Sequence, residues 1–369
     1  MSYLVNNIRR FARELATHPQ EIPKRIGGAL KVKLATGTHE LLAATGAGKV
    51  VGARYRGRGI ALMFHEIHED VEAGLRMGCS PGQLRRALAA MRAQRRDFVT
   101  PDEALARLAD PEARDFVVLT FDDAYRDNRI LALPILEEFG APMTLFTPTG
   151  MVTREIYAWW LGLRALFLQN EAVDIEAMGQ RLVCGDGPSR NAALRHVTTW
   201  IGTDLDRAEA LKATFARYGL SLPQLVAEVA MDETELRAFA AHPLVTIGGH
   251  TTTHRFLSRL DDDTARRDIA DNKAWLENLL QKTVRHFAYP YGSAGACGAR
   301  EAGFVREAGF ASAYSTRTGH LFPDHLKTPY LLPREDAGAH QSAAQLKNRL
   351  SGVNRALATG FGNPIAGLI

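Results

Sequence analysis

Short apolar segments alternate with helical stretches along most of this 369-residue chain. Such alternation is typical of parallel strands joined by crossover helices. The segments that fit a strand pattern are 59–65, 116–121, 142–147, 244–247, 284–289, 310–315 and 330–332. Helical stretches between them include 81–95, 129–139, 263–281 and 299–308. The pattern predicts an α/β fold built from parallel βα units.

Reactive side chains stand at the C-terminal ends of several predicted strands. They are His65, Asp122, Asp123, Thr147, His250 and Tyr291. A βα-barrel gathers its catalytic residues at this edge of the strands. We therefore expect these side chains to share one face of a barrel.

Two adjacent carboxylates, Asp122 and Asp123, follow the strand at 116–121. Neighbouring side chains of an extended segment point to opposite sides, so the two carboxylates can take different tasks. Taken alone, such a pair is more typical of turn and N-cap chemistry.

The strand at 244–247 leads through two glycines to His250 and His254. One helical turn would place these imidazoles on the same side, although this spacing also occurs by chance on ordinary helices. Two histidines and one carboxylate with an open position form the ligand set of a catalytic zinc site. Together the two motifs favour a metal centre with a base beside it.

Three motifs in order, Thr120-Phe-Asp-Asp123, His250-Thr-Thr-Thr-His254 and Phe287-Ala-Tyr-Pro-Tyr-Gly292, resemble those of the polysaccharide deacetylase family (the NodB-like, carbohydrate esterase family 4 group). The resemblance spans about 58–336. It implies a distorted (β/α)7-type barrel, with which the seven predicted strands agree. It also implies a divalent-metal-dependent hydrolase that removes N-acetyl groups from an amino-sugar glycan, oligosaccharide or lipid-linked precursor.

The same resemblance implies roles for individual residues. Asp123, His250 and His254 match the metal ligands, and Asp122 matches the general base. Tyr291, after Pro290, matches the position whose backbone N–H helps to hold the oxyanion. Zinc is the default metal, with Co²⁺ and Ni²⁺ as alternatives.

Two positions depart from the family pattern. Ala288 stands where many relatives have an arginine that orients the base, and Leu332-Pro333-Arg334 replaces a Leu-x-His that supplies the general acid. Arg334 is the candidate to orient Asp122 through a charge-assisted bond. His65 is the candidate acid, and the alternative for it is a buried, hydrogen-bonded histidine.

Residues 150–241 are predicted to form a helical insertion after the third strand, as a lid or one wall of the substrate groove. Its tandem Trp159-Trp160 could stack on a sugar ring. Core packing is the favoured alternative for at least one of the two indoles.

Residues 1–57 are predicted to be a basic extension, 58–340 the deacetylase barrel and 341–369 a C-terminal tail. Eleven lysines and arginines oppose three glutamates over residues 1–60. Leu4, Ile8, Phe11 and Leu15 recur there at helical spacing, which suits peripheral contact with a membrane surface or, as we prefer, packing on the barrel. Nucleic-acid binding is not expected, because no stacking platform accompanies these charges.

The three cysteines are far apart and predict neither a disulfide framework nor a cysteine metal site. The N-terminus lacks an apolar signal-peptide core, so we expect a cytoplasmic protein. Two other functions stay open at this stage. One is a hydrolase of a non-sugar amide or an O-acetyl ester on the same fold, and the other is a catalytically silent glycan-binding module.

Overall fold

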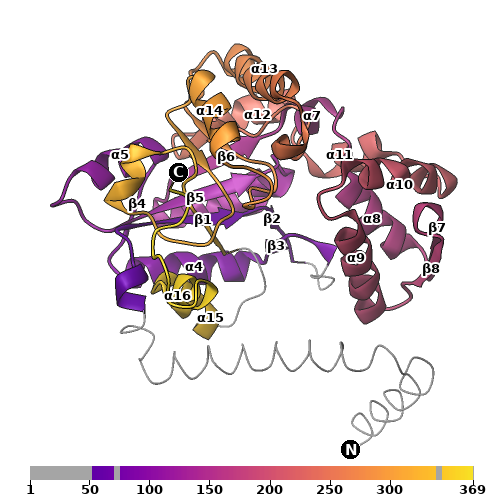
Figure 1. The fold of residues 1–369 in the computed structure, drawn as a ribbon, viewed down its shortest axis with the longest axis horizontal. Helices are drawn as coiled ribbons and strands as arrows, with labels where there is room; N and C mark the ends of the chain where they lie inside the picture. Colours follow the sequence, from indigo (N-terminus) through magenta and orange to yellow (C-terminus); the bar gives the residue numbers. More distant parts are fainter. Residues whose placement is uncertain (1–51, 70–74, 338–342, 369) are drawn as a thin grey trace, which may run out of the picture.

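A curled parallel sheet forms the centre of the computed structural model, which describes residues 52–69, 75–337 and 343–368 (Figure 1). Its strands lie in the order β11-β10-β9-β6-β5-β1-β12, and β4 pairs with β5. Their bounds are β1 Gly59–Phe64, β4 Asp97–Phe98, β5 Phe116–Asp122, β6 Met143–Thr147, β9 Val245–Gly249, β10 His286–Ala288, β11 Ser312–Tyr314 and β12 Glu335–Asp336. Two more strands, β2 (Glu66–Ile67) and β3 (Gly78–Cys79), pair with each other. The predicted α/β architecture with parallel strands is confirmed.

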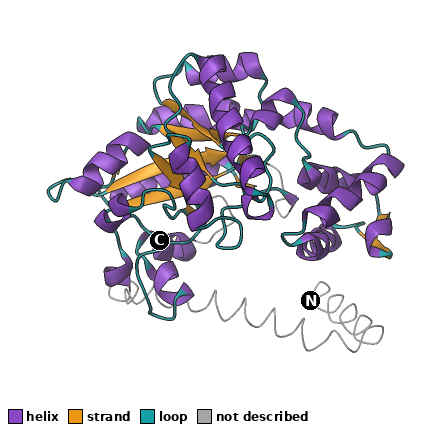
Figure 2. Cartoon of the chain, turned by 45° about the horizontal axis from the view of Figure 1, so that its top comes forward, coloured by secondary structure: helices purple, strands orange, loops and turns teal. Residues whose placement is uncertain are grey.

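Helices follow the strands and cover the outer face of the sheet (Figure 2). They are α4 Pro81–Ala93, α6 Leu133–Phe139, α13 Asp262–Leu280 and α14 Ala299–Glu307. Helix α5 (Pro101–Ala109) instead packs Ala104 and Leu108 against the inner face. The turn of π-helix η4 (Asn128–Ala132) precedes α6. Shorter 3-10 turns are η2 Ala53–Tyr55, η6 Leu257–Arg259 and η7 Pro323–Lys327.

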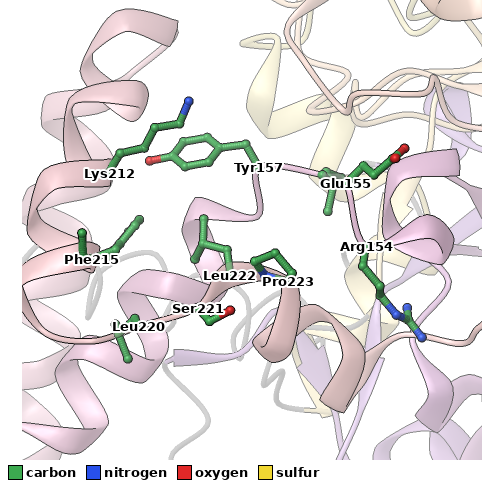
Figure 3. A pocket seen from close by; sticks show the side chains of 11 residues that line it. Arg154, Glu155, Tyr157, Lys212, Phe215, Leu220, Ser221, Leu222 and Pro223 are labelled. Atoms are coloured by element: carbon green, nitrogen blue, oxygen red, sulfur yellow. The ribbon is translucent and has the colours of Figure 1, made fainter.

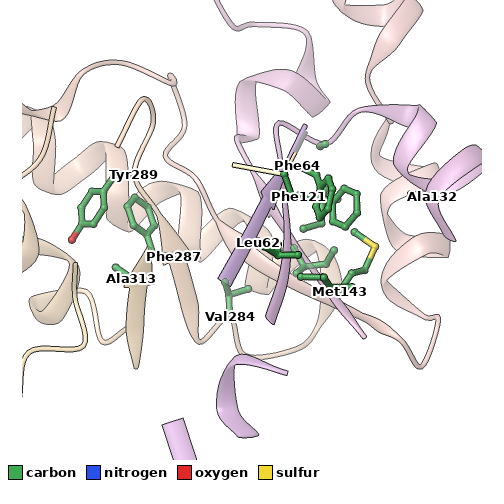
Figure 4. Packing of buried hydrophobic residues seen from close by; sticks show 14 of the residues in the cluster. Leu62, Phe64, Phe121, Ala132, Met143, Val284, Phe287, Tyr289 and Ala313 are labelled. Atoms are coloured by element: carbon green, nitrogen blue, oxygen red, sulfur yellow. The ribbon is translucent and has the colours of Figure 1, made fainter. Parts of the chain in front are cut away.

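Both faces of the central strands are buried, because alternate side chains enter two different apolar clusters. Leu62 and Phe121 belong to the outer cluster between the sheet and its helices, whereas Ala61 and Val118 belong to the inner cluster. Phe64 and Phe121 stack in the outer cluster with ring centroids 5.0 Å apart (Figure 4). Burial on both sides explains why these strands read as continuous apolar runs.

The segment 330–336 reaches from one edge of the curled sheet to the other. Leu332 forms a parallel bridge with Tyr314 of β11, and Glu335 pairs with Leu62 of β1. The seventh predicted strand, 330–332, is therefore only a bridge, and the regular strand begins after it. Pro333 lies between the two pairings and has no N–H for a ladder. Arg334 is directed into the interior at this break.

Residues 150–241 are mainly helical, and the middle part of this stretch lies beside the barrel (Figure 1). Its helices are α7 Thr149–Thr153, α8 Trp159–Gln169, α9 Gly187–Ile201, α10 Leu205–Arg217, α11 Leu222–Val229 and α12 Glu233–Ala240. Because Val152 of α7 and Leu236 and Phe239 of α12 belong to the core of the barrel, the separate region extends only from α8 to α11. An antiparallel hairpin, β7 (Ala172–Ile175) and β8 (Gln180–Val183), interrupts them with the turn η5 (Glu176–Met178) and was not expected from the sequence. The region has its own core, which includes Phe167 and Phe215.

Residues 343–368, set apart above as a tail, contain α15 (Ala343–Leu350) and α16 (Val353–Ala358). They contact the barrel, since Arg349 pairs with Glu335 and His325 bonds the carbonyl of Ala366. The apolar stripe expected around Leu4–Leu15 lies outside the described residues. Within the described part of the chain, no helix combines the length and the apolar character that a membrane span requires.

Candidate metal centre and base

Asp123 leaves the strand immediately after Asp122, the last residue of β5. The backbone of Asp123 has φ 74° and that of Ala124 φ 55°, both in the left-handed region. The expectation of two extended residues is therefore wrong for Asp123. The turn still sends the two carboxylates to different partners: Asp122 to Arg334 and Asp123 to the two histidines.

The segment from His250 to His254 is a loop, so the single helical turn expected from the i, i+4 spacing is wrong. Positive φ angles at Thr251 (61°) and His254 (55°) reverse the chain. The backbone N–H of His254 donates to Thr251 Oγ1 over 3.0 Å. The loop nevertheless brings the imidazole centroids to 5.1 Å from each other.

Asp123, His250 and His254 form a buried cluster whose ligand atoms all lie within 4.8 Å of one another. Asp123 Oδ1 is 3.6 Å from His250 Nε2 and 3.2 Å from His254 Nε2. This oxygen makes no hydrogen bond. An unpartnered buried carboxylate oxygen between two imidazoles suits a cation, and the donor set is that of a catalytic zinc site.

Protonation in the cluster also suits a metal ion. His250 Nδ1 is 2.6 Å from the carbonyl oxygen of Ala288 and donates to it, which leaves Nε2 facing Asp123. Burial lowers the pKa of His250 to about 4. Burial alone would raise the pKa of Asp123, but His254 more than offsets it, so that pKa lies well below its usual value. The cluster thus offers neutral imidazole and ionised carboxylate.

Two residues of α13 hold the histidine loop, and the sequence analysis missed both. Asp268 Oδ1 accepts the backbone N–H groups of Thr252 and Thr253, each over 2.9 Å. One turn later, Asn272 Oδ1 accepts the N–H of His250 over 2.9 Å. The signal available in the sequence was the pair Asp268 and Asn272, two polar residues four positions apart on an otherwise amphipathic helix.

Arg334 is 1% exposed and lies against Asp122. Its Nη1 donates to Asp122 Oδ1 over 2.8 Å and to Thr120 Oγ1 over 3.1 Å, and its Nε donates to the carbonyl of Ser315. Burial alone would raise the pKa of Asp122, but Arg334 and the nearby histidines lower it below its usual value. Asp122 is therefore an oriented, ionised carboxylate.

His65 lies on the other side of the same carboxylate. Its Nε2 is 3.8 Å from Asp122 Oδ2, and its side chain is 15% exposed. The imidazole is thus beside Asp122 and reachable from solvent, rather than buried in the core.

Tyr291 packs against His254 of the metal cluster. Its ring stacks on Phe256 with centroids 3.7 Å apart and lies 5.1 Å from the ring of His254. The backbone of Tyr291 has φ 61°, and the N–H of Gly292 donates to the carbonyl of the buried Pro290 over 2.7 Å. The tight turn holds the third motif beside the metal cluster.

Both tandem indoles reach residues of this site. Trp159 Nε1 donates to Tyr291 Oη over 3.2 Å, and Trp160 Nε1 donates to Tyr125 Oη over 3.1 Å. The ring of Trp160 lies 5.0 Å from that of His254. Each indole is half-buried, so neither is only a core residue.

A separate cavity of about 650 Å³ lies in the helical region, between residues 154–157 and α10–α11 (Figure 3). Tyr157, Lys212 and Phe215 line it. None of the metal-cluster or base residues does, so this cavity is distinct from the candidate site.

Comparison with known proteins agrees with this geometry. The polysaccharide deacetylase family model matches residues 186–304, which contain both histidines and the third motif but not the two aspartates. The resemblance to polysaccharide deacetylases is confirmed. The match supports the prediction of a deacetylase enzyme. No curated protein sequence matches significantly.

Solved structures support the fold. The chain is similar to a Streptococcus pyogenes deacetylase, PplD, in complex with acetate, at 16% identity and a TM-score of 0.52, covering 79% of this chain and 97% of that one. IcaB from Ammonifex degensii is 17% identical with a TM-score of 0.51, covering 80% and 97%. A de-N-acetylase from Aggregatibacter actinomycetemcomitans is 13% identical with a TM-score of 0.50, covering 79% and 99%. These likenesses confirm the distorted barrel.

Proposed function

We propose that this chain is a divalent-metal-dependent hydrolase that removes N-acetyl groups from an amino-sugar glycan, an oligosaccharide or a lipid-linked precursor. The observation that carries the proposal is the pairing of two constellations in one buried site. One is the Asp123, His250 and His254 cluster, and the other is Asp122 held by Arg334. Zinc is the default ion, and Co²⁺ and Ni²⁺ suit the same donors.

Hydrolysis of an N-acetyl group adds a water oxygen to the amide carbonyl carbon and then breaks the C–N bond. A metal ion held by Asp123, His250 and His254 would polarise the carbonyl and acidify the water. Asp122 would accept the water proton at the carboxylate, and Arg334 would keep that carboxylate ionised and oriented. His65 would donate the proton that the leaving amine needs.

The remaining contacts suit a sugar substrate. Tyr291 would contribute its backbone N–H to the developing oxyanion. Half-buried indoles at Trp159 and Trp160 would provide apolar faces for a pyranose ring. For the basic residues 1–57, contact with a membrane surface and packing on the barrel are both still proposals.

The test combines metal analysis with acetate release from chitooligosaccharides on the same samples. Wild type should contain about one metal ion per chain, as expected for a single catalytic site, and should release acetate. His250→Ala should lose both. His242→Ala is the matched control, because that imidazole pairs with Glu137 on the surface and should change neither.

The rivals predict other results. Metal without acetate release would indicate a different acyl substrate. Absence of bound metal, without rescue by added Zn²⁺, Co²⁺ or Ni²⁺, would support the silent glycan-binding module.

A further inference from the structure

Helix α8 begins with the two indoles that line the metal cluster. Trp159 donates a hydrogen bond to Tyr291. Trp160 donates a hydrogen bond to Tyr125, and its ring lies against that of His254. The position of these rings therefore depends on the position of α8 relative to the barrel. Whatever anchors α8 also sets the shape of the substrate site.

The anchor is a buried ion pair one turn along the same helix face. Arg164 stands four residues after Trp160, and its Nη1 donates to Glu66 Oε2 over 2.8 Å while its Nη2 donates to Oε1. Its Nε donates to the carbonyl of Leu75 over 3.1 Å. Arg164 is 8% exposed and Glu66 1%. Glu66 also follows His65 directly, so the pair joins α8 to the strand end that carries His65.

The far end of the helical region is also attached, at the loop after the two aspartates. Met231 N–H donates to the carbonyl of Ala124 over 3.0 Å, and Ala230 forms an antiparallel bridge with Tyr125. Arg126 donates to the carbonyls of Glu228 and Ala230. The region is thus fixed to the barrel at two places, Arg164 of α8 and the residues that follow α11.

We propose that Arg164 and Glu66 are positioning residues that hold α8 as a fixed wall of the substrate site, with Trp159 and Trp160 as its sugar-facing surface. The inference rests on the proposed deacetylase function. Of the two roles expected for residues 150–241, a lid or one wall of the substrate groove, the inference favours the wall.

The chemistry of the pair supports positioning rather than stability as its main contribution. Two apolar residues of similar size often replace a buried ion pair without loss of stability. A bidentate guanidinium–carboxylate contact instead fixes both the distance and the orientation of the two chains that carry it. Here those chains carry the indoles and His65.

The first experiment compares Arg164→Met with the double variant Arg164→Met/Glu66→Met. Both should raise KM for chitooligosaccharides about tenfold, or about 1.4 kcal/mol of binding, and lower kcat much less. Bound metal should be unchanged. Arg164→Lys, which keeps one charged contact, should fall between wild type and Arg164→Met. Arg181→Met is the matched control, because its exposed pair with Asp174 lies in the hairpin of the same region.

The double variant keeps the proposal falsifiable if Arg164→Met is poorly folded, since it removes both buried charges of the pair. Arg76, which also donates to Glu66 Oε2 over 3.2 Å, is 27% exposed and can be solvated in that variant. A wild-type KM in the double variant would overturn the proposal. The two side chains would then neutralise each other without setting the position of α8. Loss of bound metal in the double variant would also overturn it, since α8 would then be needed to form the metal cluster itself.

Quenching of tryptophan fluorescence by added Co²⁺ gives a readout that does not need turnover. Trp160 lies against His254, so Co²⁺ should quench wild type more than Trp160→Phe, and the Arg164→Met/Glu66→Met variant should resemble Trp160→Phe. If that double variant were quenched as much as wild type, the proposal that Arg164 and Glu66 hold α8 in place would be wrong. If wild type binds metal but releases no acetate, the proposed function fails while this comparison still decides where the indoles lie.

Discussion

Arg334 is a large cationic side chain with almost no contact with solvent. Its guanidinium is accommodated because Asp122, Thr120 and the carbonyl of Ser315 all accept hydrogen bonds from it. A family arginine expected two residues before Pro290 is absent here, and Ala288 uses its carbonyl to orient His250 instead. Orientation of the base therefore comes from a different part of the chain.

Arg334→Met should lower kcat/KM about 100-fold, a typical contribution of a positioned general base, because Asp122 loses the donor that orients it and keeps it ionised. Bound metal should stay at the wild-type level, since Arg334 does not contact the metal cluster. Steady-state kinetics and metal analysis measure the two effects. Arg285→Met, an exposed guanidinium paired with Asp102, is the control. Full activity of the Arg334 variant would remove Arg334 from the mechanism.

His65→Ala should reduce N-acetyl hydrolysis about 100-fold, a typical contribution of a general acid. Cleavage of an activated O-acetyl ester should change much less, because its leaving group needs no proton. Acetate release from both substrate classes by the same preparation measures the ratio. Equal losses on amide and ester would exclude His65 as the acid.

At the scale of elements, α13 acts as a brace for the metal-binding loop. Its buried Asp268 and Asn272 accept the backbone N–H groups of Thr252, Thr253 and His250. The loop contains left-handed residues that regular secondary structure does not stabilise. The helix supplies the hydrogen bonds that keep the imidazoles together.

Asp268→Ala should weaken metal binding about 10- to 100-fold, the usual effect of losing a residue that orients metal ligands. The variant leaves the N–H groups of Thr252 and Thr253 and the hydroxyl of Thr253 without their acceptor but removes no ligand. Competition with a chromogenic chelator measures the affinity. Asp271→Ala, exposed on the same helix, should bind metal as wild type does. An unchanged affinity in Asp268→Ala would show that the loop needs no brace.

At the scale of the whole molecule, buried histidines connect the barrel to the C-terminal segment 343–368. His320 Nε2 donates to the carbonyl of Arg349 in α15, and His325 bonds the carbonyl of Ala366. Burial, aided by Arg96, lowers the pKa of His320 to about 3. Since the ordinary pKa of histidine is about 6.5, the unfolded chain binds this proton more readily between the two values.

The contribution of His320 to stability is therefore complete above its ordinary pKa and is lost as pH falls towards its folded pKa. His320→Gln should remove about 1.4 kcal/mol of the change in unfolding free energy between pH 7.5 and 5.5, one pH unit below that ordinary pKa. Urea unfolding at both pH values measures it. His196→Gln, an exposed histidine, should keep the wild-type dependence. Identical pH dependence in His320→Gln and wild type would contradict the assignment.

The sequence by itself determined the strand and helix alternation and the positions of the reactive residues at strand ends. Apolar runs and helical patterns depend on local burial, so they can be recognised in single segments such as 116–121 and 263–281. The predictions of a helical turn at His250–His254 and of extended backbone at Asp123 were wrong. Left-handed backbone at non-glycine residues carries no clear local signal.

Only the tertiary structure decided which distant residues meet. The brace from α13 to the histidine loop, the Arg164–Glu66 pair and the contact of Trp159 with Tyr291 join segments separated by helices and strands. Arg334 was a candidate partner for Asp122, but its burial and three acceptors follow from the break at Pro333 between two strand pairings. Such contacts depend on how packed elements lie in space, which local patterns of burial do not encode.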